Sequence, residues 1–289
     1  MKVKSNRFGL HLFMAVPAFA LYCIFFIYPL TKGIGMSLTD WNGYGAAKFV
    51  GLKNFVDFFH DPRALSDIKT TVLFALGSAP LLNIVGLLYA LLMNSKFKGK
   101  SVATACIYMP AIISPLIMGY IWYLLLQPGR GVLFNIFNQM GHPEWFGNWM
   151  GSYTTSMVVL ILVNVWQYAG MTMIIYLAGL QNISKDLYDA AKIDGATDAQ
   201  CFKSITMPLL MPSVRINVIT NIIGSLSVFD IVMSLTGGGP GYQTETLSIY
   251  IMRMCYGSKT GYSTAVAIIM FLIVLIPVAI SMWLTRNKE

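Results

Sequence analysis

The sequence is dominated by six apolar runs, each long enough to cross a lipid bilayer as a helix. A transmembrane helix needs about 20 consecutive apolar residues. The charged residues make up only 11% of the 289-residue chain and lie mostly between these runs. We therefore predict an all-α, polytopic membrane protein with one domain over residues 1–289. The predicted spans lie near residues 10–36, 71–94, 102–126, 155–180, 212–235 and 263–285.

The composition argues against other classes of protein. Hydrophobic residues form 56% of the chain, more than in an ordinary soluble domain. The net charge of +8 comes from basic residues scattered over short loops, without a basic stripe among aromatics, so nucleic-acid binding is not predicted. The cysteines and histidines are too dispersed to predict a disulfide framework or a metal site.

The distribution of positive charge predicts the orientation of the chain. Six spans place both termini on one side of the membrane, and the connecting loops must then alternate between sides. Lysine and arginine are more numerous on the side of the termini than in the much longer loops of the opposite side. The positive-inside rule therefore predicts that both termini are cytoplasmic. It also makes the connection between spans four and five cytoplasmic.

That connection, residues 184–208, contains strong helix signals. Ser184 can cap a helix that reaches about Asp194, and Gly195 allows the chain to turn. Residues 197–200, Thr-Asp-Ala-Gln, have the form of a capping box for a second short helix. Pro208 is predicted to end that helix before the fifth span begins.

The same helix pair is predicted to dock on a protein. Acidic and basic residues are balanced along it, whereas a helix lying on lipid normally has a polar face rich in lysine and arginine. Lipid binding remains the alternative interpretation. Small side chains around the turn would let another surface approach closely.

The spacing within this segment resembles the coupling motif of ATP-binding-cassette importer permeases, which usually reads Glu-Ala-Ala, then Gly, then Ile-x-Leu-Pro. Here Asp189 replaces the glutamate and Met207 replaces the leucine. The resemblance implies a cytoplasmic helix pair that inserts into a partner ATPase. Because aspartate is shorter than glutamate, an ion pair with the ATPase would be shifted or weaker. The residues implied in coupling are Asp189, Ala190, Ala191, Gly195, Ile205 and Pro208.

A second stretch is similar to the sugar-transporting, maltose-type branch of these permeases. It comprises Phe229-Asp230, Leu235 to Pro240 with three consecutive glycines, and Thr244-Glu245-Thr246. The resemblance implies a binding-protein-dependent importer that moves a sugar or oligosaccharide into the cell by alternating access. A glycerol-3-phosphate importer permease of the same subfamily remains an alternative. An ion-coupled secondary carrier and a non-transporting membrane scaffold are further alternatives.

Polar residues on one face of spans four and five are candidates for the substrate path. They recur at helical intervals of three and four residues on both spans. Hydrogen bonding between helices is the alternative explanation. Matching positions line the substrate site in the family that the chain resembles, which favours the path. The predicted substrate-path residues are Asn164, Gln167, Tyr168, Asn221, Gly224 and Ser225.

The sequence predicts no enzymatic site. The stretch Gly99-Lys100-Ser101 lacks the glycine that a phosphate-binding loop requires five residues before Gly99, where Asn94 stands. No cofactor and no metal are predicted in this chain.

The resemblance implies that ATP and Mg bind to a partner ATPase, which hydrolyses the ATP. It implies a bacterial-type inner membrane as the location. The expected partners are a second, homologous permease in a heterodimer, two cytoplasmic ATPase subunits and an external substrate-binding protein. The identity of the sugar stays open, as does whether its site lies mainly in this subunit or in the second permease.

Overall fold

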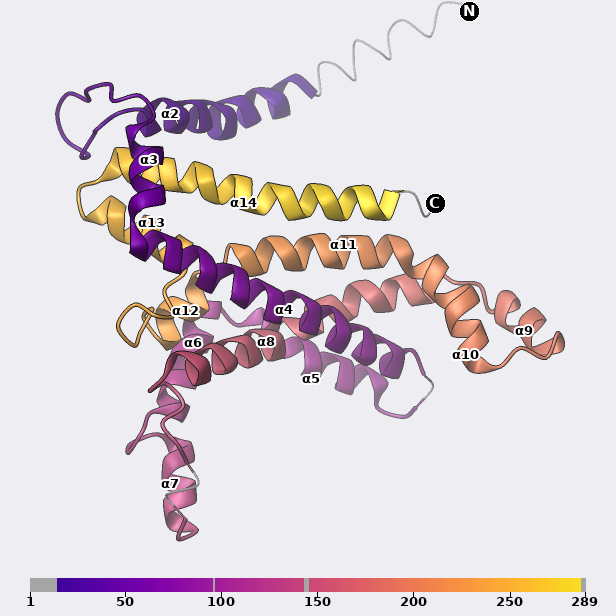
Figure 1. Cartoon of the computed structure of the whole chain (residues 1–289). Helices are drawn as coiled ribbons and strands as arrows, with labels where there is room; N and C mark the ends of the chain where they lie inside the picture. The colour runs from indigo at the N-terminus through magenta and orange to yellow at the C-terminus, as the bar shows by residue number, and fades with distance from the viewer. Residues whose placement is uncertain (1–14, 96, 143–145, 287–289) are drawn as a thin grey trace, which may run out of the picture. The chain divides into compact units, whose positions relative to one another are not determined.

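A computed structural model describes residues 15–95, 97–142 and 146–286, which are nearly all helical (Figure 1). Within these ranges the β structure consists of an isolated bridge between Thr39 and Phe49. The all-α prediction is confirmed. In chain order the elements are η1 (Cys23–Ile27), α2 (Tyr28–Ser37), α3 (Lys53–His60), α4 (Pro62–Asn94), α5 (Lys100–Ile112), α6 (Pro115–Leu126), α7 (Val132–Gln139), α8 (Tyr153–Gln181), α9 (Lys185–Ile193), α10 (Asp198–Cys201), η3 (Phe202–Thr206), α11 (Met207–Leu226), α12 (Asp230–Leu235), α13 (Leu247–Tyr256) and α14 (Thr260–Arg286).

Among the described residues, five helices are long and apolar enough to cross a membrane. A sixth span results if α5 and α6, which meet at an angle of 96°, are counted as one broken span. The first five residues of the predicted first span, 10–14, lie outside the described residues. The five continuous candidates are Ala15–Ser37, Pro62–Asn94, Tyr153–Gln181, Asp198–Leu226 and Thr260–Leu284.

The third predicted span, 102–126, is bent rather than straight. Its helix is interrupted at Ile113 and Ser114, which have extended ψ angles of 137° and 131°. A proline ring disfavours the helical conformation in the residue before it. Pro115 therefore favours the extended conformation that Ser114 adopts. Pro115 then occupies the first position of α6, where a missing N–H leaves no helical hydrogen bond unmade.

The fifth helix also differs from the predicted range 212–235. It runs without a break from Asp198 to Leu226, so the prediction that a helix ends at Pro208 is wrong. The π-helical turn η3 explains this, because the N–H of Met207 reaches back five residues to the carbonyl of Phe202. The widened turn relieves the clash that a proline ring makes with the carbonyl one turn earlier.

The chain breaks between α11 and α12, and α12 packs against α6. Gly119 of α6 lies so close to Ser234 of α12 that any side chain at residue 119 would overlap the serine hydroxyl. In the break, the carbonyl oxygen of Val228 accepts a hydrogen bond of 3.1 Å from Thr246 Oγ1. A carbonyl group freed by the break therefore has a hydrogen-bond partner, as buried backbone groups generally do.

The chain separates into two compact units. Unit 1 comprises Met1–Pro62 and Ile251–Met270, and unit 2 comprises Arg63–Tyr250 and Phe271–Glu289. Within unit 1, the Asn54 side-chain amide donates to the carbonyl oxygens of Ser37 and Thr39, at 2.7 and 2.8 Å. The single domain over residues 1–289 stays a prediction.

The core of unit 2 joins α4, α8 and α11. Helix α8 also packs closely against α5, where Gly170 lies against the backbone of Ile107 with no room for a side chain. Small residues let helices approach closely in membranes. The packing holds one face of α8 against α11, where the polar residues of both helices meet. The buried cluster contains Ala90, Met93, Met173, Tyr176, Leu177, Leu180 and Leu210.

Candidate functional site

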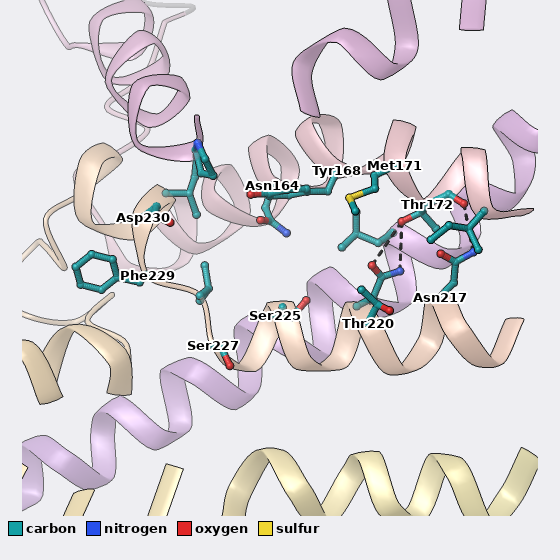
Figure 2. Close-up of a pocket in the computed structure, with 17 residues that line it drawn as sticks. Asn164, Tyr168, Met171, Thr172, Asn217, Thr220, Ser225, Ser227, Phe229 and Asp230 are labelled. Atoms are coloured by element: carbon teal, nitrogen blue, oxygen red, sulfur yellow. Dashed lines mark hydrogen bonds between the residues drawn. The ribbon is translucent and has the colours of Figure 1, made fainter. Parts of the chain in front are cut away.

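A cavity of about 250 Å³ lies between α8 and α11 in unit 2, and Figure 2 shows polar side chains of the two helices on opposite sides of it. The break after α11 and the first residues of α12 also line it. Its lining includes Asn164, Tyr168, Met171 and Thr172 from α8, Asn217, Thr220, Asn221, Gly224 and Ser225 from α11, and Ser227, Val228, Phe229 and Asp230 beyond them.

Five of the six predicted substrate-path residues line this cavity. They come from two helices and were predicted from helical spacing and from the family resemblance. Because α8 and α11 pack side by side, the two polar faces meet, as the spacing requires. The five are Asn164, Tyr168, Asn221, Gly224 and Ser225. Their contact with a substrate stays a prediction.

Gln167, the sixth predicted residue, lies elsewhere. Its side chain is fully buried, and its Nε2 donates to the carbonyl oxygen of Ile113 at 3.0 Å. That carbonyl lies at the break between α5 and α6, where Ile113 and Ser114 leave the helical conformation. Gln167 follows Asn164 by three residues, so the two side chains point in directions about 60° apart around the helix axis. This places Gln167 toward the edge of the polar face. Its observed contact is structural.

Some of the cavity's amides are already engaged between helices. Asn164 Nδ2 donates to Ser78 Oγ of α4 at 2.6 Å. Asn221 and the Thr172 hydroxyl exchange hydrogen bonds of 3.4 and 3.5 Å, which Figure 2 marks. Asn217 Nδ2 donates to the Thr172 carbonyl oxygen at 3.2 Å. The alternative of interhelical hydrogen bonding therefore describes part of what these amides do.

Ser225, Gly224 and Tyr168 have capacity left for a ligand. Ser225 is 2% exposed, and its hydroxyl has no hydrogen-bond partner among the described residues. A buried hydroxyl without a partner costs about 1–3 kcal/mol. A side chain added at Gly224 would meet open space. Tyr168 is half-buried and adds an aromatic ring to the lining.

Other lining residues were missed, and two of them had a signal in the sequence. Thr172 follows Tyr168 by four residues, and Thr220 follows Asn217 by three, so both continue the helical spacing. Ser227 and Phe229 belong to the break after α11, which the apolar run does not reveal.

The helix pair between α8 and α11 has the predicted caps. The hydroxyl of Ser184 accepts from the N–H of Asp186 at 3.3 Å, and α9 ends at Ile193. Gly195 turns the chain with φ +81°, a backbone conformation that residues with a side chain rarely adopt. The predicted capping box is present, with Thr197 and Gln200 each bonding the other's backbone N–H.

The same segment presents its motif residues at the surface. Asp189, Ala190, Gly195 and Pro208 are exposed, and Ala191 and Ile205 are half-buried. A hydrogen bond of 2.9 Å between the hydroxyls of Tyr188 and Thr206 holds α9 to η3. Figure 1 shows α9 and α10 extending beyond the ends of α8 and α11. Between α9 and α10 lies a hollow of about 310 Å³.

Known proteins are similar to this chain in sequence and in fold over nearly its whole length. A probable starch degradation products transport system permease of Thermoanaerobacterium thermosulfurigenes is 33% identical to this chain. The matched region covers 100% of this chain and 97% of the relative. A trehalose/maltose transport system permease of Thermococcus litoralis is 32% identical, with coverages of 95% and 92%.

Two further similarities bear on function. An sn-glycerol-3-phosphate transport system permease of Yersinia pestis is 29% identical, covering 91% of this chain and 89% of its own. The crystal structure of a bacterial ABC transporter that imports the acidic polysaccharide alginate contains a chain that superposes with a TM-score of 0.83. That chain is 26% identical, with coverages of 98% and 96%.

The family assignment follows from the extent of these matches. The profile of the family described as binding-protein-dependent transport system inner membrane component matches residues 83–288, most of the chain. The fold, the apolar spans and the full-length relatives agree with it. This chain therefore belongs to the family of binding-protein-dependent transport system inner membrane components, the multi-pass permeases of ATP-binding-cassette importers.

Proposed function

We propose that this chain is the permease subunit of an ATP-driven importer for a neutral sugar or oligosaccharide, and that the cavity between α8 and α11 is its part of the sugar path. Two relatives carry sugar or starch products in their names, which supports the substrate class. The importer alternates between outward-open and inward-open states, and the polar faces of α8 and α11 offer hydrogen bonds to the sugar on its way.

The chemistry of the cavity lining carries this proposal. Hydroxyls and amides surround the cavity, Tyr168 and Phe229 supply aromatic rings, and Ser225 has an unused buried hydroxyl. Sugar hydroxyls pair with such groups, and the apolar faces of sugar rings pack on aromatic rings. None of the described residues that line the cavity is a lysine or arginine.

The absence of a cation in that lining argues against a phosphorylated substrate. The similarity to an sn-glycerol-3-phosphate permease makes that substrate the second candidate. Phosphate recognition relies on arginine or lysine donors. The carboxylate of Asp230 at the cavity would repel a phosphate. A neutral sugar fits better.

The proposed assembly includes a second, homologous permease that completes the path. Two cytoplasmic ATPase subunits bind ATP and Mg, and one of them docks on residues 184–208 of this chain. Both termini of this chain are cytoplasmic. An external binding protein delivers the sugar. A similar alginate transporter has been solved in complex with an alginate pentasaccharide-bound periplasmic protein, which supports this last partner.

Reconstitution of the purified transporter with its natural partners tests the proposal. ATP hydrolysis and uptake into vesicles are measured with the binding protein and maltose, trehalose or sn-glycerol 3-phosphate. We expect a neutral sugar to stimulate both activities. Stimulation by sn-glycerol 3-phosphate alone would support the second candidate instead. Uptake that persists without the ATPase would indicate a secondary carrier.

A further inference from the structure

A second hollow in unit 2, of about 780 Å³, lies where four helix ends meet. Its lining includes Asn94 and Gln181, the last residues of α4 and α8, and Lys100 and Lys185, the first residues of α5 and α9. It shares no lining residue with the cavity between α8 and α11. Its volume is in the range of small-molecule sites in proteins, about 300–1,000 Å³.

The hollow is lined by positively charged side chains. Lys98, Lys100 and Lys185 line it, and they come from two loops that are far apart in the sequence. None of the described lining residues is acidic. Across the residues that the structure describes, the ion pair found is that of Arg63, so these three ammonium groups have no carboxylate partner there. Like charges held together favour an anion between them.

The start of α5 adds further donors to the same place. Gly99 precedes the helix with φ +88° and offers no side-chain cap, so the first N–H groups of α5 have no helical partner. The positive end of the helix dipole adds to the field of Lys98 and Lys100. This N-terminus contributes to the site but does not define it.

The depth of the hollow distinguishes a lipid from a protein partner. Asn94 and Gln181 end two of the helices that are long and apolar enough to span the membrane. From this we infer that the hollow faces the headgroup region of one leaflet. Phe97, Leu180 and Ile183 give it an apolar wall. Lys185 also begins the segment 184–208 on which the ATPase is proposed to dock, but the exposed turn at Gly195 lies at the opposite end of α9.

We propose that this hollow binds the phosphate of an anionic phospholipid, with the lysines around the phosphate and the apolar wall against the start of an acyl chain. Basic pockets between transmembrane helices bind such headgroups. A protein acidic side chain would match the lysines but not the apolar wall at this depth. The bound lipid would hold the ends of α4, α5, α8 and α9 together beside the helix pair.

Lipid binding by the assembled transporter tests the proposal. The complex is purified in detergent and titrated with dioleoylphosphatidylglycerol or dioleoylphosphatidylcholine, and bound lipid is counted by native mass spectrometry. The variant Lys98→Gln/Lys185→Gln removes two of the charges. The matched control Lys48→Gln/Lys53→Gln removes equal charge from exposed residues that neither line the hollow nor belong to residues 184–208. Thermal unfolding of each variant verifies that the complex is intact.

We expect the wild type to prefer phosphatidylglycerol. The Lys98/Lys185 variant should bind it about thirtyfold more weakly, because two lysines at roughly 1 kcal/mol each contribute about 2 kcal/mol. The control should stay within about twofold. Three results would overturn the proposal: equal binding of the two lipids, equal losses in both variants, or loss of ATPase subunits with unchanged lipid binding, which would identify a protein contact. Inorganic phosphate at millimolar concentration should not replace the lipid, and if it does, the hollow is a site for small anions.

Discussion

Arg63 at the start of α4 forms a two-point ion pair with Glu245, which lies 182 residues further along the chain. Its Nε lies 2.7 Å from Oε2 of Glu245, and its Nη2 lies 3.1 Å from Oε1. Glu245 is fully buried, and the guanidinium carbon lies 4.0 Å from the centre of the Tyr242 ring. The polar stretch that follows α12 is therefore fixed to α4.

Replacing Arg63 by Met should destabilise the protein, because the buried carboxylate of Glu245 loses its partner. Removing one member of a fully buried pair typically costs about 3–5 kcal/mol. The loss here should be smaller, because the Arg63 side chain is 33% exposed and water can reach the pair. The double variant Arg63→Met/Glu245→Gln should recover part of this loss, since no charge is left buried. Thermal unfolding of the purified complex measures both. Equal melting temperatures for wild type and Arg63→Met would show that the pair does not stabilise the fold.

Substitutions at Gln167 and Ser225 should have different effects, the first on the stability of the complex and the second on transport. Gln167→Leu leaves the Ile113 carbonyl oxygen without its donor, which costs about 1–3 kcal/mol, so less complex should be recovered while uptake per complex is retained. Ser225→Ala should keep or raise recovery, because it removes a buried hydroxyl that has no partner among the described residues, and it should lower uptake several-fold. The reverse pattern would place the sugar beside Gln167 instead.

Much of the fold could be predicted because a bilayer imposes long apolar runs on the sequence. The caps at Ser184 and Thr197 were also predictable, since each lies within three residues of the groups that it bonds. The bend before Pro115 has a local cause, but the apolar run continues across it. Hydropathy therefore predicts one straight span where the structure has two helices.

The other differences depend on contacts that are distant in sequence. The break after Leu226 is accompanied by packing of Gly119 on Ser234 and by the bond from Thr246 to Val228. Gln167 shares the helical spacing of the cavity residues, yet the break at Ile113 gives it another partner. Spacing identifies which residues share a face, whereas neighbouring helices decide which of them line a cavity.

Substitutions at Asp189 should test the docking of the ATPase. Asp189 is exposed on α9, so Asp189→Lys should keep the fold but place a positive charge where the family usually has glutamate, and less ATPase should copurify. The control Asp189→Glu restores the usual residue and should keep ATPase association at or above the wild-type level. Normal association and uptake with Asp189→Lys would mean that another surface couples the two subunits.

Thiol labelling of intact cells should report the orientation. Native Cys201 is a poor probe because it is buried, whereas Ile193 is 87% exposed and Cys255 is exposed. In a background without the other cysteines, an impermeant maleimide should label Cys255 from outside. Ile193→Cys should react only after the cells are opened. Labelling of both in intact cells would contradict the cytoplasmic placement of residues 184–208.

The most direct measurement of the sugar path is uptake by transporters in which the cavity is filled. Gly224 lines the cavity, and a Cβ atom added there has no atom within 4 Å beyond its chain neighbours and its own helix backbone, so the bulky side chain of Gly224→Trp should fill much of the cavity. The control Ile223→Trp adds similar bulk at the neighbouring, exposed residue of α11, which does not line the cavity.

Uptake of the transported sugar is measured per assembled complex, with ATPase content and the sugar affinity of the binding protein determined in parallel. We expect Gly224→Trp to lower uptake by about tenfold or more, because a ligand site that is filled cannot admit a substrate. Ile223→Trp should transport nearly as the wild type does. Wild-type uptake by an intact Gly224→Trp complex would show that the sugar does not pass between α8 and α11.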